Sequence, residues 1–176
     1  MKHIIIFIVA FSLTNLSNAQ TKEKILSKAE QFSTKAGTLI QKKFVEVGSI
    51  KSAKVRVIHY TDLISSQTIS SVRIEYDVAS KYSTDTKIAS LDSDEIEGLI
   101  KSIKIMQSKV FTSSPTTYTE VTFKSRGGFE AGCYWSKDIW KTYLKLEKFD
   151  GKSYVFLNVE DFPELLSLLE KSKSIL

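Results

Sequence analysis

The chain has 176 residues, of which 42% are hydrophobic, 26% charged and 11% aromatic, and its formal net charge at pH 7 is +5. This composition is that of an ordinary globular protein, and it excludes collagen-like, disulfide-rich and intrinsically disordered chains. One domain is expected, because a chain of this length can bury enough surface to fold without a metal or a disulfide.

The first 19 residues have the three parts of a secretory signal peptide. Lys2 provides a positive start, residues 4–13 form an apolar run, and Ser17 and Ala19 are the small residues of a cleavage site, so we predict cleavage after Ala19. The apolar run is too short for the ~20 residues that cross a bilayer. No later stretch is longer, so the mature chain is expected to be a soluble, exported protein, periplasmic or secreted, without a membrane span.

A short helical segment is predicted for residues 20–36, where Ile25, Ala29 and Phe32 recur at helical spacing. After Gly37 the apolar residues alternate with polar ones, which is the period of a strand. We predict four strands, at residues 38–47, 53–60, 71–78 and 87–91. A helix should follow over residues 93–107, and its apolar stripe is formed by Ile96, Leu99, Ile100 and Ile103.

The second half repeats this order of elements. Four strands are predicted, at residues 118–124, 129–135, 140–147 and 153–157. The last helix should begin at Glu160 or Asp161, so that Pro163 lies in its first turn. Its apolar stripe, which repeats the spacing of residues 96, 99, 100 and 103, consists of Phe162, Leu165, Leu166 and Leu169.

We therefore predict a single α+β domain, residues 37–176, built from two ββββα repeats (37–107 and 118–176). The fold should have antiparallel sheets, two main helices and the short N-terminal helix, because two such units can bury their apolar faces in one shared core. The alternative to an internal duplication is that two amphipathic helices after strands share this spacing by chance. The element order resembles the duplicated ββββα architecture of Whirly and PUR-type single-stranded nucleic-acid-binding proteins. None of their sequence motifs is present, so the resemblance implies a fold and carries no functional residues.

Residue patterns of common enzymes and metal sites are missing from the sequence. There is no Gly-rich phosphate loop and no H-E-x-x-H, C-x-x-C or G-x-S-x-G motif, so we predict no catalytic residues, no metal ligands and no cofactor. His59 is interpreted as a half-buried strand residue hydrogen-bonded to the backbone. Cys133 is interpreted as a small buried hydrophobe, with pairing to another chain as the alternative. The acidic clusters at both helix starts are interpreted as complements of the helix dipoles.

Aromatic and basic residues concentrate in the second half. Strand alternation places Tyr134 and Tyr143 opposite core positions, and Lys141 and Lys145 lie on the same strand as Tyr143. We predict that these four residues form an exposed aromatic–basic patch, which suits a sugar, a peptide or an anionic polymer. The alternative is that they only stabilise the solvent face of a sheet.

The expected function is that of a non-enzymatic protein which binds a ligand or partner in the cell envelope or outside the cell. An exported hydrolase is one alternative, and it requires Asp62, Glu75 or Asp77 to converge with His59. Single-stranded nucleic-acid or polyanion binding is the other, although export and the mild net charge disfavour it. The residues available for polyanion binding are Lys42, Lys43, Lys51, Lys54, Arg56, Phe44 and Tyr60.

Overall fold

The structure is a computed structural model that describes residues 26–176. The predicted signal peptide, residues 1–19, and the first part of the predicted N-terminal helical segment, residues 20–25, lie outside the described residues. Among the described residues, no helix has both the length and the apolar character needed to cross a membrane.

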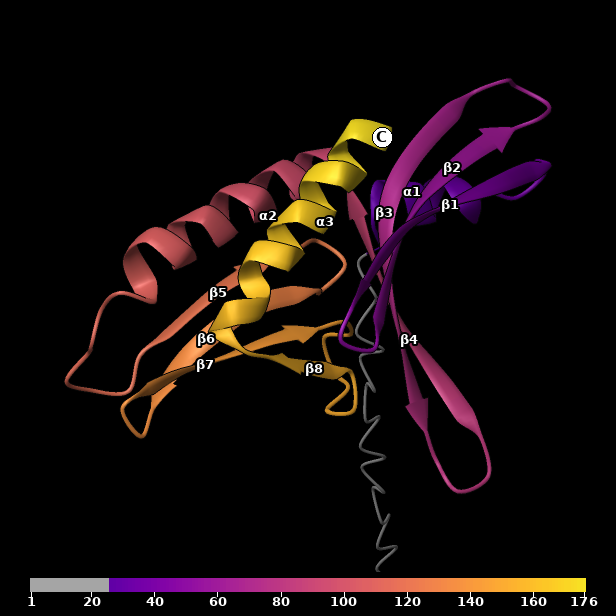
Figure 1. Ribbon diagram of the computed structural model, residues 1–176. Helices are drawn as coiled ribbons and strands as arrows, with labels where there is room; N and C mark the ends of the chain where they lie inside the picture. The colour runs from indigo at the N-terminus through magenta and orange to yellow at the C-terminus, as the bar shows by residue number, and fades with distance from the viewer. Residues whose placement is uncertain (1–25) are drawn as a thin grey trace, which may run out of the picture.

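The first half of the chain forms a four-stranded antiparallel sheet between two helices (Figure 1). Helix α1 is short and ends at Ser33. The strands follow one another across the sheet in chain order, and helix α2 leads into a π-helical turn, Met106–Val110. The bounds are α1 Lys28–Ser33, β1 Ile40–Ile50, β2 Ala53–Asp62, β3 Thr68–Ala79, β4 Thr84–Asp92 and α2 Ser93–Ile105.

The second half forms another four-stranded antiparallel sheet, again in chain order, followed by a helix. Pro163 lies in the first turn of that helix, as predicted. The bounds are β5 Glu120–Lys124, β6 Glu130–Ser136, β7 Ile139–Lys145, β8 Tyr154–Leu157, a 3-10 turn Val159–Asp161 and α3 Phe162–Ile175. The α+β fold with antiparallel sheets, repeated ββββα order, two main helices and a short N-terminal helix is thus confirmed.

The strands of the first sheet are longer than the sequence predicts. The ladder between β3 and β4 continues as far as the pair Ala79 and Thr84, beyond the predicted end of one strand at residue 78 and the predicted start of the other at residue 87. Backbone groups pair irrespective of side-chain polarity, so alternation of apolar residues marks only the buried part of a strand.

Helices α2 and α3 pack side by side, with the second sheet beneath them and the first sheet along their other side (Figure 1). Both predicted stripes point inward, since Ile96, Leu99 and Ile103 of α2 are fully buried and the stripe of α3 is buried except for the half-buried Leu166. One core contains residues of both sheets and both helices. The two repeats therefore share a single interior.

Helix α3 also reaches across to the first sheet. The Lys171 ammonium group donates a hydrogen bond to the Val47 carbonyl oxygen at 2.8 Å. Gly48 of β1 lies so close to α3 that an added Cβ would be 2.7 Å from a methyl carbon of Leu168. On the opposite face of the first sheet, α1 covers a second, small core formed by Ala29, Ile58 and Tyr60.

Candidate functional site

The outer face of the second sheet, which is turned away from the shared core, carries the four residues predicted as a binding patch. Tyr134 of β6 pairs directly with Lys141 of β7, and Tyr143 and Lys145 follow at alternate positions of β7. The intervening residues, such as Leu144, are buried in the core. Strand alternation therefore brings Tyr134, Tyr143, Lys141 and Lys145 to one face, as predicted, although each of them is half-buried rather than exposed.

Five aromatic rings follow one another across this face, and we call them the aromatic row. The ring centroids are 6.3 Å apart for Tyr118 and Tyr134, 6.4 Å for Tyr134 and Tyr143, and 5.4 Å for Tyr143 and Tyr154. Phe156 ends the row, stacked on Tyr154 at 5.8 Å with the ring planes 10° apart. Each distance lies in the range of favourable aromatic pairs. The structure thus extends the predicted patch into a continuous surface of rings.

Tyr154 and Phe156 were not among the predicted site residues. The signal was present, because both alternate with Val155 and Leu157 in β8, whose side chains are buried. Only the pairing of β8 with β7 shows that they join the same face: Lys145 lies opposite Tyr154, and Tyr143 lies opposite Phe156.

Gly132 allows the central ring of the row to lie close to the sheet. It sits between Thr122 and Tyr143 on the neighbouring strands, and a Cβ at this position would be 2.9 Å from the Tyr143 hydroxyl. The Tyr143 and Thr122 hydroxyls are 3.2 Å apart and share a hydrogen bond. Burial raises the pKa of the Tyr143 phenol, so this ring is neutral at physiological pH.

Charges of both signs accompany the aromatic row. The ammonium group of Lys141 lies 6.0 Å from the Tyr134 ring centroid, and that of Lys145 lies 5.3 Å from the Tyr154 ring centroid. These are distances of cation–π contacts. Two carboxylates lie on the same face: Glu130, whose Oε1 is 3.3 Å from the Lys124 ammonium group, and Glu120, which accepts a hydrogen bond from Tyr118. The face is therefore mixed in charge rather than strongly basic.

A pocket of about 650 Å³ opens beside the row, where β8 stops, and we call it the end pocket. Strand β7 begins at Ile139, but its pairing with β8 covers only the part from Thr142 onward. The uncovered part of β7, the end of β8 and the segment after α2 form the walls. The lining residues are Phe111, Thr112, Ser113, Ser114, Tyr134, Trp135, Asp138, Ile139, Trp140, Lys141, Thr142, Phe156, Leu157, Asn158, Val159 and Glu160.

Trp135 and Trp140 meet edge to face in this pocket, with ring centroids 5.4 Å apart. The Trp140 indole N–H donates a hydrogen bond to the Ser113 carbonyl oxygen at 3.0 Å, which holds the loop after α2 against β7. The strand period places Trp135 on the core side with Cys133, and the sequence therefore predicts a core residue. That prediction is wrong in part: Trp135 is half-buried and lines the end pocket, close to the turn of the β6–β7 hairpin.

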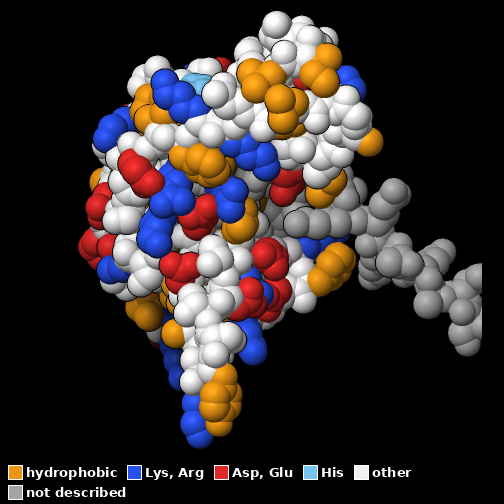
Figure 2. Space-filling view, turned by 90° about the vertical axis from the view of Figure 1, so that its right-hand side faces the viewer, with side chains coloured by type: hydrophobic (Ala, Val, Ile, Leu, Met, Phe, Trp, Pro, Cys, Tyr) orange, Lys and Arg blue, Asp and Glu red, His pale blue; other side chains and the backbone are white. Residues whose placement is uncertain are grey.

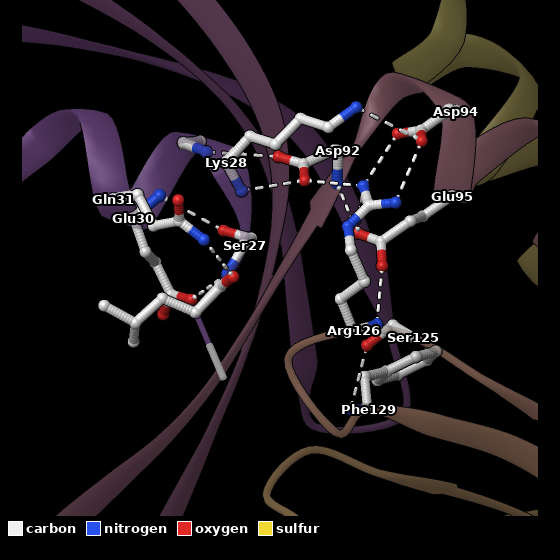
Figure 3. Close-up of polar contacts among 12 residues, drawn as sticks. Ser27, Lys28, Glu30, Gln31, Asp92, Asp94, Glu95, Ser125, Arg126 and Phe129 are labelled. Atoms are coloured by element: carbon white, nitrogen blue, oxygen red, sulfur yellow. Dashed lines mark hydrogen bonds and ion pairs between the residues drawn. The ribbon is translucent and has the colours of Figure 1, made fainter. Parts of the chain in front are cut away.

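The acidic residues at the start of α2 form a polar junction rather than a ligand site (Figure 3). The Asp92 carboxylate accepts hydrogen bonds from the backbone N–H groups of Lys28 and Ala29, at 2.9 and 3.2 Å. Arg126 of the β5–β6 turn donates to both Asp92 and Asp94, and the pKa of Asp94 is lowered well below its usual range as a result. The junction connects α1, α2 and the β5–β6 hairpin. The sequence predicts only that these acids interact with the dipole of their own helix.

The residues required for the hydrolase alternative do not converge. The Nδ1 atom of His59 lies 2.7 Å from the Ser70 hydroxyl oxygen, so its partner is a side chain rather than the predicted backbone group. Asp62 is held by the turn that follows it, Glu75 by two arginines, and Asp77 by a lysine and a threonine. Within residues 26–176, no group of three or more His, Cys, Asp or Glu side chains could hold a metal ion.

The basic residues proposed for polyanion binding are largely paired with acids. Lys51 contacts Asp161 at 3.1 Å, Lys54 contacts Asp77 at 3.1 Å, and Arg56 contacts Glu46 and Glu75. Lys42 and Lys43 are neighbours in β1, so they point to opposite faces of the sheet. Figure 2 shows basic and acidic side chains interspersed on the face of the molecule that it draws. The predicted set does not form a continuous basic strip.

Comparison with known proteins adds no relative from which a role could be transferred. No protein-family model matches the chain, and no curated protein or solved structure gives a significant match. The likeness to Whirly and PUR-type proteins is one of element order.

Proposed function

We propose that the protein is an exported, non-enzymatic binding protein whose ligand lies along the aromatic row of the second sheet. The row carries the proposal, because five rings are in consecutive contact on one solvent-facing surface. The two terminal rings, Tyr118 and Phe156, are 66% and 65% exposed. Rings that only stabilised the sheet would be expected to bury more of their area against neighbours, so the terminal rings favour a binding role.

The chemistry of the row suits a ligand with flat or apolar faces and polar edges. Tyrosine presents a stiff ring with few rotatable bonds, so that little entropy is lost when a ligand stacks on it. Its hydroxyl group can donate and accept hydrogen bonds at the rim of the same surface. The partners of His59, Asp62, Glu75 and Asp77 favour binding over hydrolysis, because each group is engaged separately.

The charge of the face favours a ligand that is not a strong polyanion. Three lysines (Lys124, Lys141 and Lys145) share the surface with Glu120 and Glu130. A nucleic-acid surface combines stacking rings with a groove that is positive throughout, because phosphates must be neutralised. The mixed charge is therefore an argument for an uncharged or zwitterionic polymer.

The test is a binding screen with variants of the row. The purified protein would be run in affinity gels that contain soluble polysaccharides, and titrated with a single-stranded oligonucleotide and with a mixture of peptides. We expect at least one class to bind, and Tyr134→Ala and Phe156→Ala to weaken binding roughly tenfold, since one stacked ring contributes about 1–3 kcal/mol. Tyr82→Ala is the matched control, because Tyr82 is 88% exposed in the first half of the chain, between β3 and β4.

Two results would contradict the proposal. One is the absence of binding to all three classes of probe. The other is binding that the row variants leave at the level of the Tyr82→Ala control. N-terminal sequencing of the exported protein separately tests export, and a first residue near Gln20 is expected.

A further inference from the structure

The end pocket has the size and the composition of a site for a small polar molecule. Its volume of about 650 Å³ falls within the usual range for small-ligand pockets. Trp135 and Trp140, the only two tryptophans of the chain, form part of its wall. Tyr134 and Phe156 belong both to the pocket and to the aromatic row, so one ligand can occupy the two without a break.

Two carboxylates at the pocket are free to accept hydrogen bonds. Asp138 and Glu160 line the pocket, and neither side chain has an ion pair or hydrogen bond with any residue of the described part of the chain. Other acids near this sheet are engaged: Asp150 and Asp161, for example, pair with lysines of the first repeat. Both side chains are exposed, so a ligand in the pocket can reach them as acceptors.

The backbone at Asp138 is held in a conformation that non-glycine residues rarely adopt. Lys137 and Asp138 form the two-residue turn between Ser136 and Ile139, and their φ angles are +54° and +60°. Such turns favour Asn-Gly, because glycine has no Cβ to strain. The present turn instead carries Lys137 and Asp138, and Asp138 lines the pocket.

We infer that the end pocket is a saccharide subsite that takes an uncharged sugar ring, and that the aromatic row binds the chain continuing from it. This inference rests on the proposed function and names its ligand as a glycan. A sugar ring has an apolar C–H face, which can stack on an indole, and hydroxyl edges, which can donate to Asp138 and Glu160. Asn158 and Lys141 offer further polar groups at the same rim.

Other ligand classes fit the pocket less well. A phosphate would meet two unpaired carboxylates and only one lysine, Lys141, so the local charge opposes it. An extended peptide would add to a strand edge, but the edge that β8 leaves uncovered is limited to residues 139–141 of β7. A neutral saccharide uses the rings and the carboxylates together.

Tryptophan fluorescence reports on this site alone, because both tryptophans line it. The full protein would be titrated with glucose, N-acetylglucosamine, cellotetraose, chitotetraose and a single-stranded oligonucleotide. We expect a saturable change of tryptophan emission with a saccharide, and at least tenfold weaker binding in Asp138→Asn and Glu160→Gln. Both substitutions keep the side-chain shape, and the melting temperature checks the fold. Glu164→Gln is the matched control, because Glu164 is an exposed acid of α3 outside the pocket.

The outcomes separate the subsite from the function. If saccharide polymers bind in a way that depends on Tyr134 and Phe156, while tryptophan emission and the carboxylate variants show no effect, the subsite is refuted and the proposed function stands. If the oligonucleotide binds, and binds more tightly to Glu160→Gln, the ligand is a polyanion and the saccharide assignment is overturned. If no probe responds to the row variants, both proposals fail.

Discussion

The Nη2 atom of Arg126 lies 2.7 Å from the Oδ2 atom of Asp92, and this ion pair joins the β5–β6 turn of the second repeat to the end of β4 in the first (Figure 3). The Asp92 side chain is almost completely buried and also accepts hydrogen bonds from two N–H groups of α1. One carboxylate therefore serves three segments that are far apart in the sequence.

Removing the guanidinium group should weaken this junction. We expect Arg126→Ala to lower the free energy of unfolding by about 2–3 kcal/mol, because a buried charge loses its ionic partner. Arg126→Lys should recover only part of the loss, since an ammonium group lacks the planar fork that reaches two carboxylates. Urea denaturation measures both. Lys109→Ala is the control, and an equal midpoint for Arg126→Ala and the control would refute the role of the junction.

The free energy of unfolding at acidic pH should depend on Asp94. Hydrogen bonds from Arg126 hold the pKa of Asp94 well below its usual value of 3.8, and a bond from Lys87 similarly lowers that of Asp150. A carboxyl group with a lower pKa in the folded state stabilises the protein above its unfolded pKa, and this contribution is lost as the pH falls further.

We therefore expect the free energy of unfolding to decrease as the pH is lowered below about 4, through protonation of these groups. Asp94→Asn should show a smaller decrease between pH 7 and pH 3, because it has no charge to lose at this position. Denaturation midpoints at the two pH values provide the measurement. An identical decrease in the wild type and the variant would show that Asp94 does not contribute.

Gly132 should be intolerant of a side chain. A Cβ there would lie 2.9 Å from the Val121 carbonyl oxygen as well as from the hydroxyls of Thr122 and Tyr143. We expect Gly132→Ala to cost about 1–3 kcal/mol of stability through overpacking, and to weaken ligand binding by displacing the Tyr143 ring. Gly151→Ala is the control, because a Cβ added at Gly151 would meet no atom within 4 Å. Unchanged stability of Gly132→Ala would contradict the close packing of the row.

Cys133 should be unreactive in the folded protein. The side chain is fully buried, and burial raises the pKa of the thiol to about 11. At pH 8 the thiol is therefore protonated and shielded, and a thiol reagent should label it only after unfolding in denaturant. Rapid labelling of the native protein would instead show that the thiol is accessible, and a disulfide-linked dimer on a non-reducing gel would support the alternative of pairing with another chain.

Local periodicity was sufficient to predict the helices and strands and part of the binding face. The stripes that contain Ile96 and Phe162 are buried because apolar residues at helical spacing lie on one face of a helix, and that face packs against the core. Tyr134 and Tyr143 were found for the same reason, since strand alternation sets the face of a side chain. Trp135 shows the limit: periodicity assigned its face correctly, but not whether other residues cover it.

The sequence by itself determined the order of the elements, their buried faces and the position of Tyr134, Tyr143, Lys141 and Lys145 on one side of a sheet, because these follow from neighbouring residues along the chain. Only the tertiary structure decided that Tyr154 and Phe156 extend that surface, that Arg126 meets Asp92, and that a pocket forms where β8 ends. These features join segments that are distant in the sequence, and their contacts depend on how the two sheets and the helices pack.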